Sequence, residues 1–321
     1  MADFRPIQVS TDMAIEARDI VRGDAHEEVP GVRVDRKNDQ GVEITRVNVF
    51  TDEGARLMGK PQGHYITLDV PQFRERNAQV RKGLIRVLTE ELKNLIPETV
   101  ERTVLVVGLG NWNATPDALG PRVVERLLVT RHLTGVVPDD IRQRMRSVAA
   151  VAPGVLGTTG IETLDMIKGI VNESGPDLVI AVDALAARSL DRLLGSVQIA
   201  DTGIHPGSGV GNRRQGLNQD TVGVPVVAIG VCTVVQAMSI AEEAVHLLAQ
   251  ELANDVKFYK ILEELGESNQ KGLMQEVLGE RLGELMVTPK EIDLLINDMA
   301  DVLAEALNRT LQPRLDRSEW I

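Results

Sequence analysis

The pattern of apolar and polar positions changes along the first third of the chain. Residues 42–49 and 64–70 alternate apolar with polar side chains, which is typical of strands with one buried face. Residues 74–95 carry apolar side chains at the spacing of an amphipathic helix. These patterns predict a β-rich start that leads into alternating strands and helices.

Continuous runs of apolar and β-branched residues follow, and each run is typical of a strand buried on both faces. They cover residues 103–110, 177–185 and 225–230. Helical patterns occupy residues 119–129, 161–172, 186–194 and 233–252. Because strands that alternate with helices build parallel sheets, we expect an α/β fold with a mostly parallel sheet flanked by helices.

The two ends of the chain depart from this pattern. Residues 1–40 are polar, mixed in charge and interrupted by prolines and glycines, so we expect an N-terminal arm outside the core. Residues 257–311 are helical and rich in polar side chains, which predicts a helical C-terminal extension. No repeat or low-complexity linker divides the chain, so one elaborated domain is favoured over two.

Composition is that of an ordinary globular protein. The 321 residues are 43% apolar and 26% charged, which is enough to bury a substantial core. The balance of 35 Lys and Arg against 47 Asp and Glu gives a net charge of -12, and no basic stripe is present. We therefore expect no direct binding to nucleic acid.

Cysteine usage and hydropathy indicate the compartment. The single cysteine, Cys232, excludes an intramolecular disulfide and a CxxC metal site. The N-terminus lacks the apolar run of a signal peptide, and no segment has the apolar length of a membrane span. We therefore expect a cytoplasmic protein that does not bind a membrane.

Two predicted strands are each followed by an aspartate. Asp117 lies in the loop GLGNWNATPDALGP after the first buried run, and Asp183 lies at the end of the second. Either residue alone fits an ordinary helix cap or turn. The carboxyl ends of parallel strands meet at one edge of the sheet, however. Repulsion between two carboxylates there would raise the pKa of one of them above that of the other. The pair therefore predicts a general acid and a general base.

Other chemistries have weaker support. The glycines after the first strand resemble a dinucleotide fingerprint, but Asn113 occupies the place of the third glycine and no phosphate-binding GxxxxGK[ST] motif occurs. Ser208 and Cys232 lie outside a GxSxG motif, and the apolar surroundings of Cys232 predict a buried, unreactive thiol. Nucleophilic catalysis is therefore the less favoured interpretation.

A glycine-rich segment at residues 202–216 holds further candidates. His205 is the histidine that we associate with a site, and Arg213 and Arg214 are suited to binding a substrate carboxylate. An ordinary surface loop explains the same residues. The five histidines show no HExxH spacing, so we expect no metal and no other cofactor.

The segments VVGLGNWNATPDALGPRVV and VIAVDALAARS resemble the germination protease family, the endopeptidases of bacterial endospores, and the resemblance extends over nearly the whole chain. They are similar, more distantly, to hydrogenase-maturation endopeptidases. The resemblance implies a hydrogenase-maturation-protease-like (phosphorylase/hydrolase-like) α/β fold. It also places the acidic residues of the family on Asp117 and Asp183.

The same resemblance implies a function and its setting. Members of the family are aspartic-type endopeptidases that degrade small acid-soluble spore proteins during germination, in the forespore and spore core. They are made as inactive homotetrameric zymogens that trim their own N-termini. Substrates are cut after the acidic residue of a motif resembling Thr-Glu-Phe/Ile-Ala-Ser-Glu.

Residues 11–16 of this chain are similar to that motif. They read Thr-Asp-Met-Ala-Ile-Glu, with Asp12 in place of glutamate, Met13 in place of phenylalanine or isoleucine, and Ile15 in place of serine. The similarity predicts self-cleavage between Asp12 and Met13, which divides the chain into a propeptide of residues 1–12 and a catalytic domain of residues 13–321. An incidental helix start explains the same residues.

The expected mechanism uses one ionised and one protonated carboxyl group of Asp117 and Asp183, without assigning which is which. Asn111, Asn113 or nearby backbone N–H groups are candidates for stabilising the oxyanion. Two alternatives stay open at this point. One is a metal-dependent endopeptidase of the hydrogenase-maturation type, and the other is a binding protein without enzymatic activity on an α/β scaffold.

Overall fold

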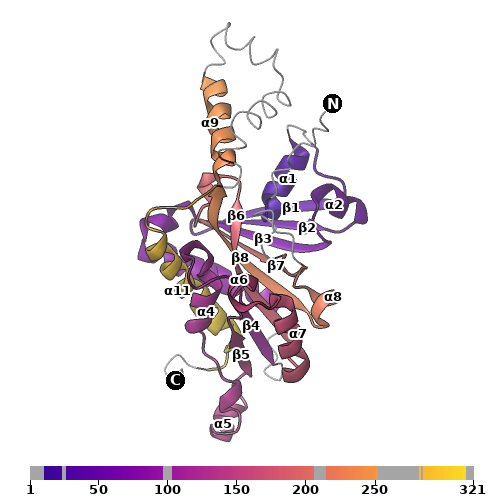
Figure 1. The fold of residues 1–321 in the computed structure, drawn as a ribbon, viewed down its shortest axis with the longest axis vertical. Helices are drawn as coiled ribbons and strands as arrows, with labels where there is room; N and C mark the ends of the chain where they lie inside the picture. The colour runs from indigo at the N-terminus through magenta and orange to yellow at the C-terminus, as the bar shows by residue number, and fades with distance from the viewer. Residues whose placement is uncertain are drawn as a thin grey trace.

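A single mixed sheet organises the chain in this computed structural model, which describes residues 11–23, 27–96, 103–205, 215–251, 282 and 285–315. Within those residues the sheet has the order β1-β2-β3-β7-β8-β6-β4-β5, and β9 pairs with β8 (Figure 1). The strands are β1 (Val32–Asp39), β2 (Val42–Val49), β3 (Gly63–Asp69), β4 (Val104–Gly108), β5 (Val148–Val151), β6 (Leu178–Ala187), β7 (Ser196–Ala200), β8 (Val226–Gln236) and β9 (Met286–Val287).

Helices surround this sheet. They are α1 (Ala14–Arg22), α2 (Asp52–Met58), α3 (Ala78–Leu95), α4 (Leu119–Glu125), α5 (Asp139–Arg142), α6 (Leu156–Thr159), α7 (Thr163–Ser174), α8 (Gln219–Val222), α9 (Ala237–Glu251) and α11 (Ile292–Leu311). Short 3₁₀ helices are η1 (Pro71–Glu75), η2 (Thr115–Asp117), η3 (Arg131–Leu133) and η4 (Leu190–Arg192). None of the described helices combines the length and the apolar character that a membrane span requires.

The sheet consists of two halves with different strand directions. Strands β5, β4, β6 and β8 are parallel, and their apolar runs are buried, as strands covered on both faces require. Strands β8, β7, β3, β2 and β1 pair antiparallel. The predicted α/β fold is confirmed, and the parallel half contains the three buried runs that the sequence indicated.

Each face of the sheet has its own core. On one face, side chains of α3, α4 and α11 pack in a cluster that includes Leu88, Leu119 and Leu303. On the other face, α1 and α7 contribute to a second cluster that includes Ile15 and Ile167. Burial of such side chains contributes about 1.5–3 kcal/mol each. The second cluster matters for the site because α1 brings the start of the described chain onto the sheet.

The expected N-terminal arm outside the core is wrong for residues 11–39. Helix α1 is amphipathic, and Met13, Ala14 and Ile15 on its inner face are at most 1% exposed. Residues 32–39 then form β1, an edge strand with mostly exposed side chains that pairs with β2 through a hairpin. The polar sequence of β1 suits an edge strand, which is why it resembled an arm.

The predicted helix at residues 186–194 is also wrong. Ala186 and Ala187 continue β6 and pair with Val234 and Val235 of β8, because sheet pairing overrides the helix propensity of alanine. The same pairing extends β8 to Gln236, so the helix expected from residue 233 begins at Ala237. Strand β7 follows η4 and was not predicted.

The remaining helix predictions differ mainly at their ends. Helix α3 begins after the N-cap Asn77, later than expected, and α4 ends at Glu125. The C-terminal extension is confirmed in α11, which is amphipathic and packs on α3 and α4. The rest of the predicted extension, residues 257–281, lies outside the described residues.

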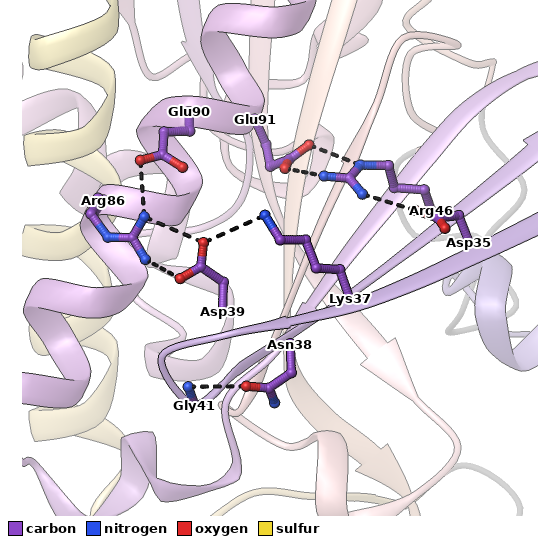
Figure 2. Close-up of polar contacts among 9 residues, drawn as sticks. All are labelled: Asp35, Lys37, Asn38, Asp39, Gly41, Arg46, Arg86, Glu90 and Glu91. Atoms are coloured by element: carbon purple, nitrogen blue, oxygen red, sulfur yellow. Dashed lines mark hydrogen bonds and ion pairs between the residues drawn. The ribbon is translucent and has the colours of Figure 1, made fainter.

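Ion pairs attach the β1–β2 hairpin to helix α3 (Figure 2). Arg46 of β2 donates two hydrogen bonds to the buried Glu91 of α3, at 2.5 and 3.2 Å. Arg86 of α3 donates in turn to Asp39 of β1, at 2.6 Å. Planar guanidinium groups suit such two-point contacts with carboxylates. The hairpin is thereby fixed against a helix that also packs on the core.

Candidate active site

Asp117 is carried by a loop that folds back on the end of β4. Strand β4 ends at Gly108, and the backbone N–H of Asn111 donates to the carbonyl oxygen of Asp117 at 3.0 Å. Gly110 has a φ of 116°, and a Cβ there would lie 2.0 Å from that carbonyl oxygen. Only glycine permits this approach. The loop therefore places the half-buried Asp117 in η2 beside the carboxyl end of β4.

Asp183 lies on β6 where that strand extends past β4. The last β4 residue, Gly108, pairs with Val182, and Asp183 itself pairs with Gly230 of β8. Only 5% of Asp183 is exposed, and its Oδ1 accepts a hydrogen bond from the Ala184 N–H at 2.9 Å. The two predicted aspartates are thus brought to the same edge of the parallel strands.

The surroundings of Asp183 favour its neutral form. Burial raises the pKa of the Asp183 carboxyl well above its ordinary value, and the nearby charges of Asp117 and Asp12 raise it further. The Ala184 N–H opposes these effects and does not outweigh them. The Asp183 carboxyl therefore holds its proton more tightly than an ordinary carboxyl group, beside a second carboxyl group.

The segment that precedes α1 lies in the same site. The backbone N–H of Ala186 donates to the Asp12 carboxylate at 3.1 Å. The pairing of β6 with β8 shifts register between Leu185 and Ala186, and such bulges release a backbone group from the ladder. The predicted cleavage point thus lies three residues along β6 from Asp183, on the side of the sheet covered by α1.

Two side chains that were not predicted contact this segment. Lys60 Nζ donates to the carbonyl oxygens of Asp12 at 2.9 Å and Thr11 at 3.1 Å. Gln198 Nε2 donates to the Asp12 carbonyl at 3.2 Å, and Gln198 Oε1 accepts from the Ala14 N–H at 2.7 Å. Neither residue lies in a recognisable motif, although a glutamine inside the apolar run SVQIA is unusual.

The first turn of α1 is anchored through Glu16, which is 6% exposed. Its carboxylate accepts hydrogen bonds from the backbone N–H groups of Arg188 and Ser189, between 3.1 and 3.3 Å. It also forms an ion pair with Arg192 at 3.4 Å and accepts a bond from the Thr11 hydroxyl. Residues 11–16 are therefore held at both ends.

His205 contributes to a cavity of about 50 Å³ that is also lined by Asp12, Lys60, Gln198 and Gly230. Burial, followed by the Lys60 charge, lowers the pKa of His205, while Asp12 opposes the shift. The imidazole is therefore neutral near pH 7. Arg213, Arg214 and Ser208 lie outside the described residues, so the expected carboxylate contacts of the two arginines stay predictions.

The predicted amide groups have local contacts. Asn111 Oδ1 accepts a hydrogen bond from the Asn113 N–H at 3.0 Å, which is the arrangement of an Asx turn. Asn113 itself is exposed. Their role in oxyanion stabilisation stays a prediction. Between them, Trp112 is 46% exposed, which is a large apolar side chain in contact with solvent beside Asp117.

Cys232 is fully buried in β8, and burial raises the pKa of its thiol well above its ordinary value. The expectation of an unreactive thiol is therefore supported by the geometry. Within the described part of the chain, no three His, Cys, Asp or Glu side chains are grouped so as to hold a metal ion.

Comparison with known proteins identifies the family. The family model for germination protease matches residues 9–260 and 251–320. A germination protease of Caldanaerobacter subterraneus subsp. tengcongensis is 46% identical over 315 residues, which cover 97% of this chain and 96% of the relative. One from Bacillus cereus is 40% identical over 356 aligned positions, which cover 98% and 96%.

A solved structure is also similar. It is a NiFe hydrogenase maturation protease from Thermococcus kodakarensis KOD1, with 20% identity and a TM-score of 0.37, and the match covers 69% of this chain and 98% of that one. A germination protease of Clostridium perfringens is 45% identical over 313 residues, which cover 96% of each chain. The full-length matches show that this chain is a peptidase and that it belongs to the germination protease family.

Proposed function

We propose that this protein is an aspartic-type endopeptidase that first cuts its own chain between Asp12 and Met13. The observation that carries the proposal is the buried Asp183, whose raised pKa reflects burial and the neighbouring charges of Asp117 and Asp12. Two carboxyl groups in unequal environments are the arrangement that acid–base hydrolysis requires. In this proposal, Asp12 precedes the bond that is cut.

The unequal environments of Asp183 and Asp117 support one assignment of the two roles. Asp183 is buried and protonated, so it acts as the general acid, and the more exposed Asp117 acts as the general base. Asp117 takes a proton from a water molecule, whose oxygen attacks the carbonyl carbon of Asp12. Asp183 then gives its proton to the departing nitrogen of Met13. The products are a carboxyl group on Asp12 and a free amine on Met13.

After this processing, the substrates are the small acid-soluble spore proteins of the forespore and spore core, degraded during germination. Membership of the germination protease family supports this setting. Residues 1–12 then act as the propeptide of a zymogen, and residues 13–321 form the catalytic domain of a homotetramer. Because residues 11–16 occupy the site, they exclude other chains until they are cut.

Intact-mass measurement of the purified full chain during mild acid incubation tests this function. The wild-type chain should lose residues 1–12, and Asp117→Asn should slow the cut by about 100-fold to 10,000-fold because the base is lost. Asp140→Asn is the matched control, since Asp140 is exposed on α5, far from α1 in Figure 1.

The control should process at the wild-type rate. Processing of Asp117→Asn at that same rate would refute the assigned base. If neither the wild-type chain nor the control is cut, and neither digests a peptide with the sequence of residues 8–19, then the protein is not an endopeptidase of this kind.

A further inference from the structure

The carbonyl group of Asp12 receives two side-chain donors. Lys60 Nζ lies 2.9 Å and Gln198 Nε2 lies 3.2 Å from the carbonyl oxygen. The donors come from distant parts of the chain, since Lys60 precedes β3 and Gln198 lies within β7. One ammonium group and one amide group therefore converge on a single peptide oxygen.

The orientation of the Gln198 amide follows from its neighbours. The Ala14 N–H can only donate, and it lies 2.7 Å from one end of the amide, so that end is Oε1. The amide nitrogen must then face the Asp12 carbonyl. Gln198 is 9% exposed, and this bond to α1 fixes its position. The donor is thus already oriented before any reaction.

Lys60 supplies a positive charge at the same oxygen. Burial lowers the pKa of its ammonium group, while the charges of Asp12 and Glu16 oppose that shift. The described charged or titratable groups beside it are Asp12, Glu16 and His205. Asp12 and Glu16 do not cancel the effect of burial, which leaves the pKa of Lys60 below its ordinary value, while the N–H groups of Nζ still donate to the Asp12 carbonyl oxygen.

The sheet places this carbonyl near the carboxyl pair. Asp183 of β6 and Gln198 of β7 both pair with Gly230 of β8, so the three residues form one row across adjacent strands. Residues in such a row share a face, and neighbouring strands are about 4.8 Å apart. Gly230 has no side chain of its own in this row, and the Leu185 side chain lies over it. The charge of Asp12 also contributes to the pKa of Asp183, which requires proximity.

We propose that Lys60 and Gln198 form the oxyanion-binding site for the bond between Asp12 and Met13, and for the matching carbonyl of later substrates. This proposal rests on the proposed function. Donors held in place before the reaction stabilise charge as it develops, because they need no rearrangement. Lys60 and Gln198 therefore take the role that the sequence had suggested for Asn111 and Asn113.

The chemical step balances with these groups. Water oxygen bonds to the Asp12 carbonyl carbon, its proton goes to the base carboxylate, and the carbonyl electron pair moves to the oxygen. That oxyanion is held by Lys60 Nζ–H and Gln198 Nε2–H without proton transfer. The pair then re-forms the carbonyl as the carbon–nitrogen bond breaks, and the acid carboxyl protonates the Met13 nitrogen.

The test compares self-cleavage rates of full-length variants by intact mass. Lys60→Met keeps the length of the side chain and removes its charge, and Gln198→Glu keeps the acceptor for Ala14 while removing the donor. Each should slow cleavage by about 100-fold to 1,000-fold, as loss of one oxyanion donor does. Lys82→Met is the matched control because Lys82 is exposed on α3, and it should cleave at the wild-type rate.

Hydrogen exchange of the α1 amides, measured on the same samples, separates catalysis from docking. Slow cleavage in a variant whose α1 amides exchange as slowly as in wild type supports the oxyanion site. Wild-type rates in both variants would overturn it while leaving the proposed function intact. Slow cleavage with lost α1 protection would also overturn it, because the residues would then only hold the segment. Absence of cleavage in the wild-type and Lys82→Met chains would refute both proposals together.

Discussion

The two halves of the sheet contribute different chemistry to one site. The parallel half carries Asp117 in the loop after β4 and Asp183 within β6, and both strands are apolar and buried. The antiparallel half carries Gln198 on β7, and Lys60 precedes its strand β3. In the proposed mechanism, the first half holds the proton-transfer groups and the second holds the hydrogen-bond donors. Function therefore depends on how the two halves are joined.

Strand β8 joins them, because it pairs parallel with β6 and antiparallel with β7. Gly230 lies at this junction, and a Cβ there would lie 2.3 Å from the Leu185 side chain. A larger residue would need to displace that side chain. Gly230 therefore leaves the space that the Leu185 side chain of β6 occupies at this junction.

Among substitutions that distinguish the two halves of the sheet, Asp183→Asn in the parallel half should have the largest effect on stability and cleavage. Because the folded-state pKa of Asp183 is raised above about 3.9, its contribution to stability is complete below that pH. The contribution is lost as pH rises through the folded-state pKa, at about 1.4 kcal/mol per pH unit. Asp183→Asn should therefore unfold at a higher denaturant concentration than wild type at pH 7, while losing cleavage.

Denaturant titrations at pH 4 and pH 7 measure this difference. The stability advantage of Asp183→Asn should shrink at pH 4, where the folded-state carboxyl is protonated and about half of the unfolded-state carboxyl groups are protonated too. An advantage of equal size at both pH values would contradict a buried, protonated Asp183. Asp140→Asn, at an exposed site, should match wild type throughout.

A smaller effect is expected where the antiparallel half meets α3. Arg46→Met would leave the buried Glu91 without its guanidinium partner (Figure 2). We expect a loss of about 1–2 kcal/mol in the free energy of unfolding. Lys37→Met is the control, because its ammonium is exposed and lies 3.8 Å from Asp39. Equal stability of the two variants in urea titrations would show that this contact does not hold the hairpin.

The smallest effect concerns α11, which Asp298 ties to Arg76 and Arg81. Burial raises the pKa of the Asp298 carboxyl, but its bonds to the two arginines outweigh burial and leave that pKa below its ordinary value. The resulting stability is present above about pH 3.9 and is lost as pH falls through the folded-state pKa. Asp298→Asn should lower the melting temperature at pH 7 by about 2 °C.

Melting curves at pH 7 and pH 3 check the sign of this effect. The difference in melting temperature between Asp298→Asn and wild type should narrow at pH 3. Protonation there begins to remove the negative charge of the wild-type carboxylate, which asparagine lacks at every pH. A difference that grows at pH 3 would contradict the lowered pKa. The ion pairs of Asp298 are with Arg76 and Arg81 and not with the carboxyl pair, so self-cleavage at pH 7 should be unchanged.

The parallel half was predicted well from the sequence because each of its long strands can be recognised from a short local pattern of residues. Apolar β-branched runs predicted β4, β6 and the start of β8, and the aspartates that follow β4 and lie in β6 were placed together before the fold was known. Burial on both faces demands such runs whatever surrounds them. The position of Asp117 and Asp183 at one edge followed from strand direction alone.

Tertiary structure decided the other half. Strand β1 and the segment before α1 are polar by sequence, and only pairing and packing show that Met13 and Ile15 are buried. Lys60 and Gln198 carry no motif, because their positions depend on contacts between residues up to 186 apart along the chain. Local patterns determine which strands are buried and which acids follow them. Long-range pairing determines that Lys60 and Gln198 donate to the Asp12 carbonyl, which belongs to the bond of the proposed cleavage.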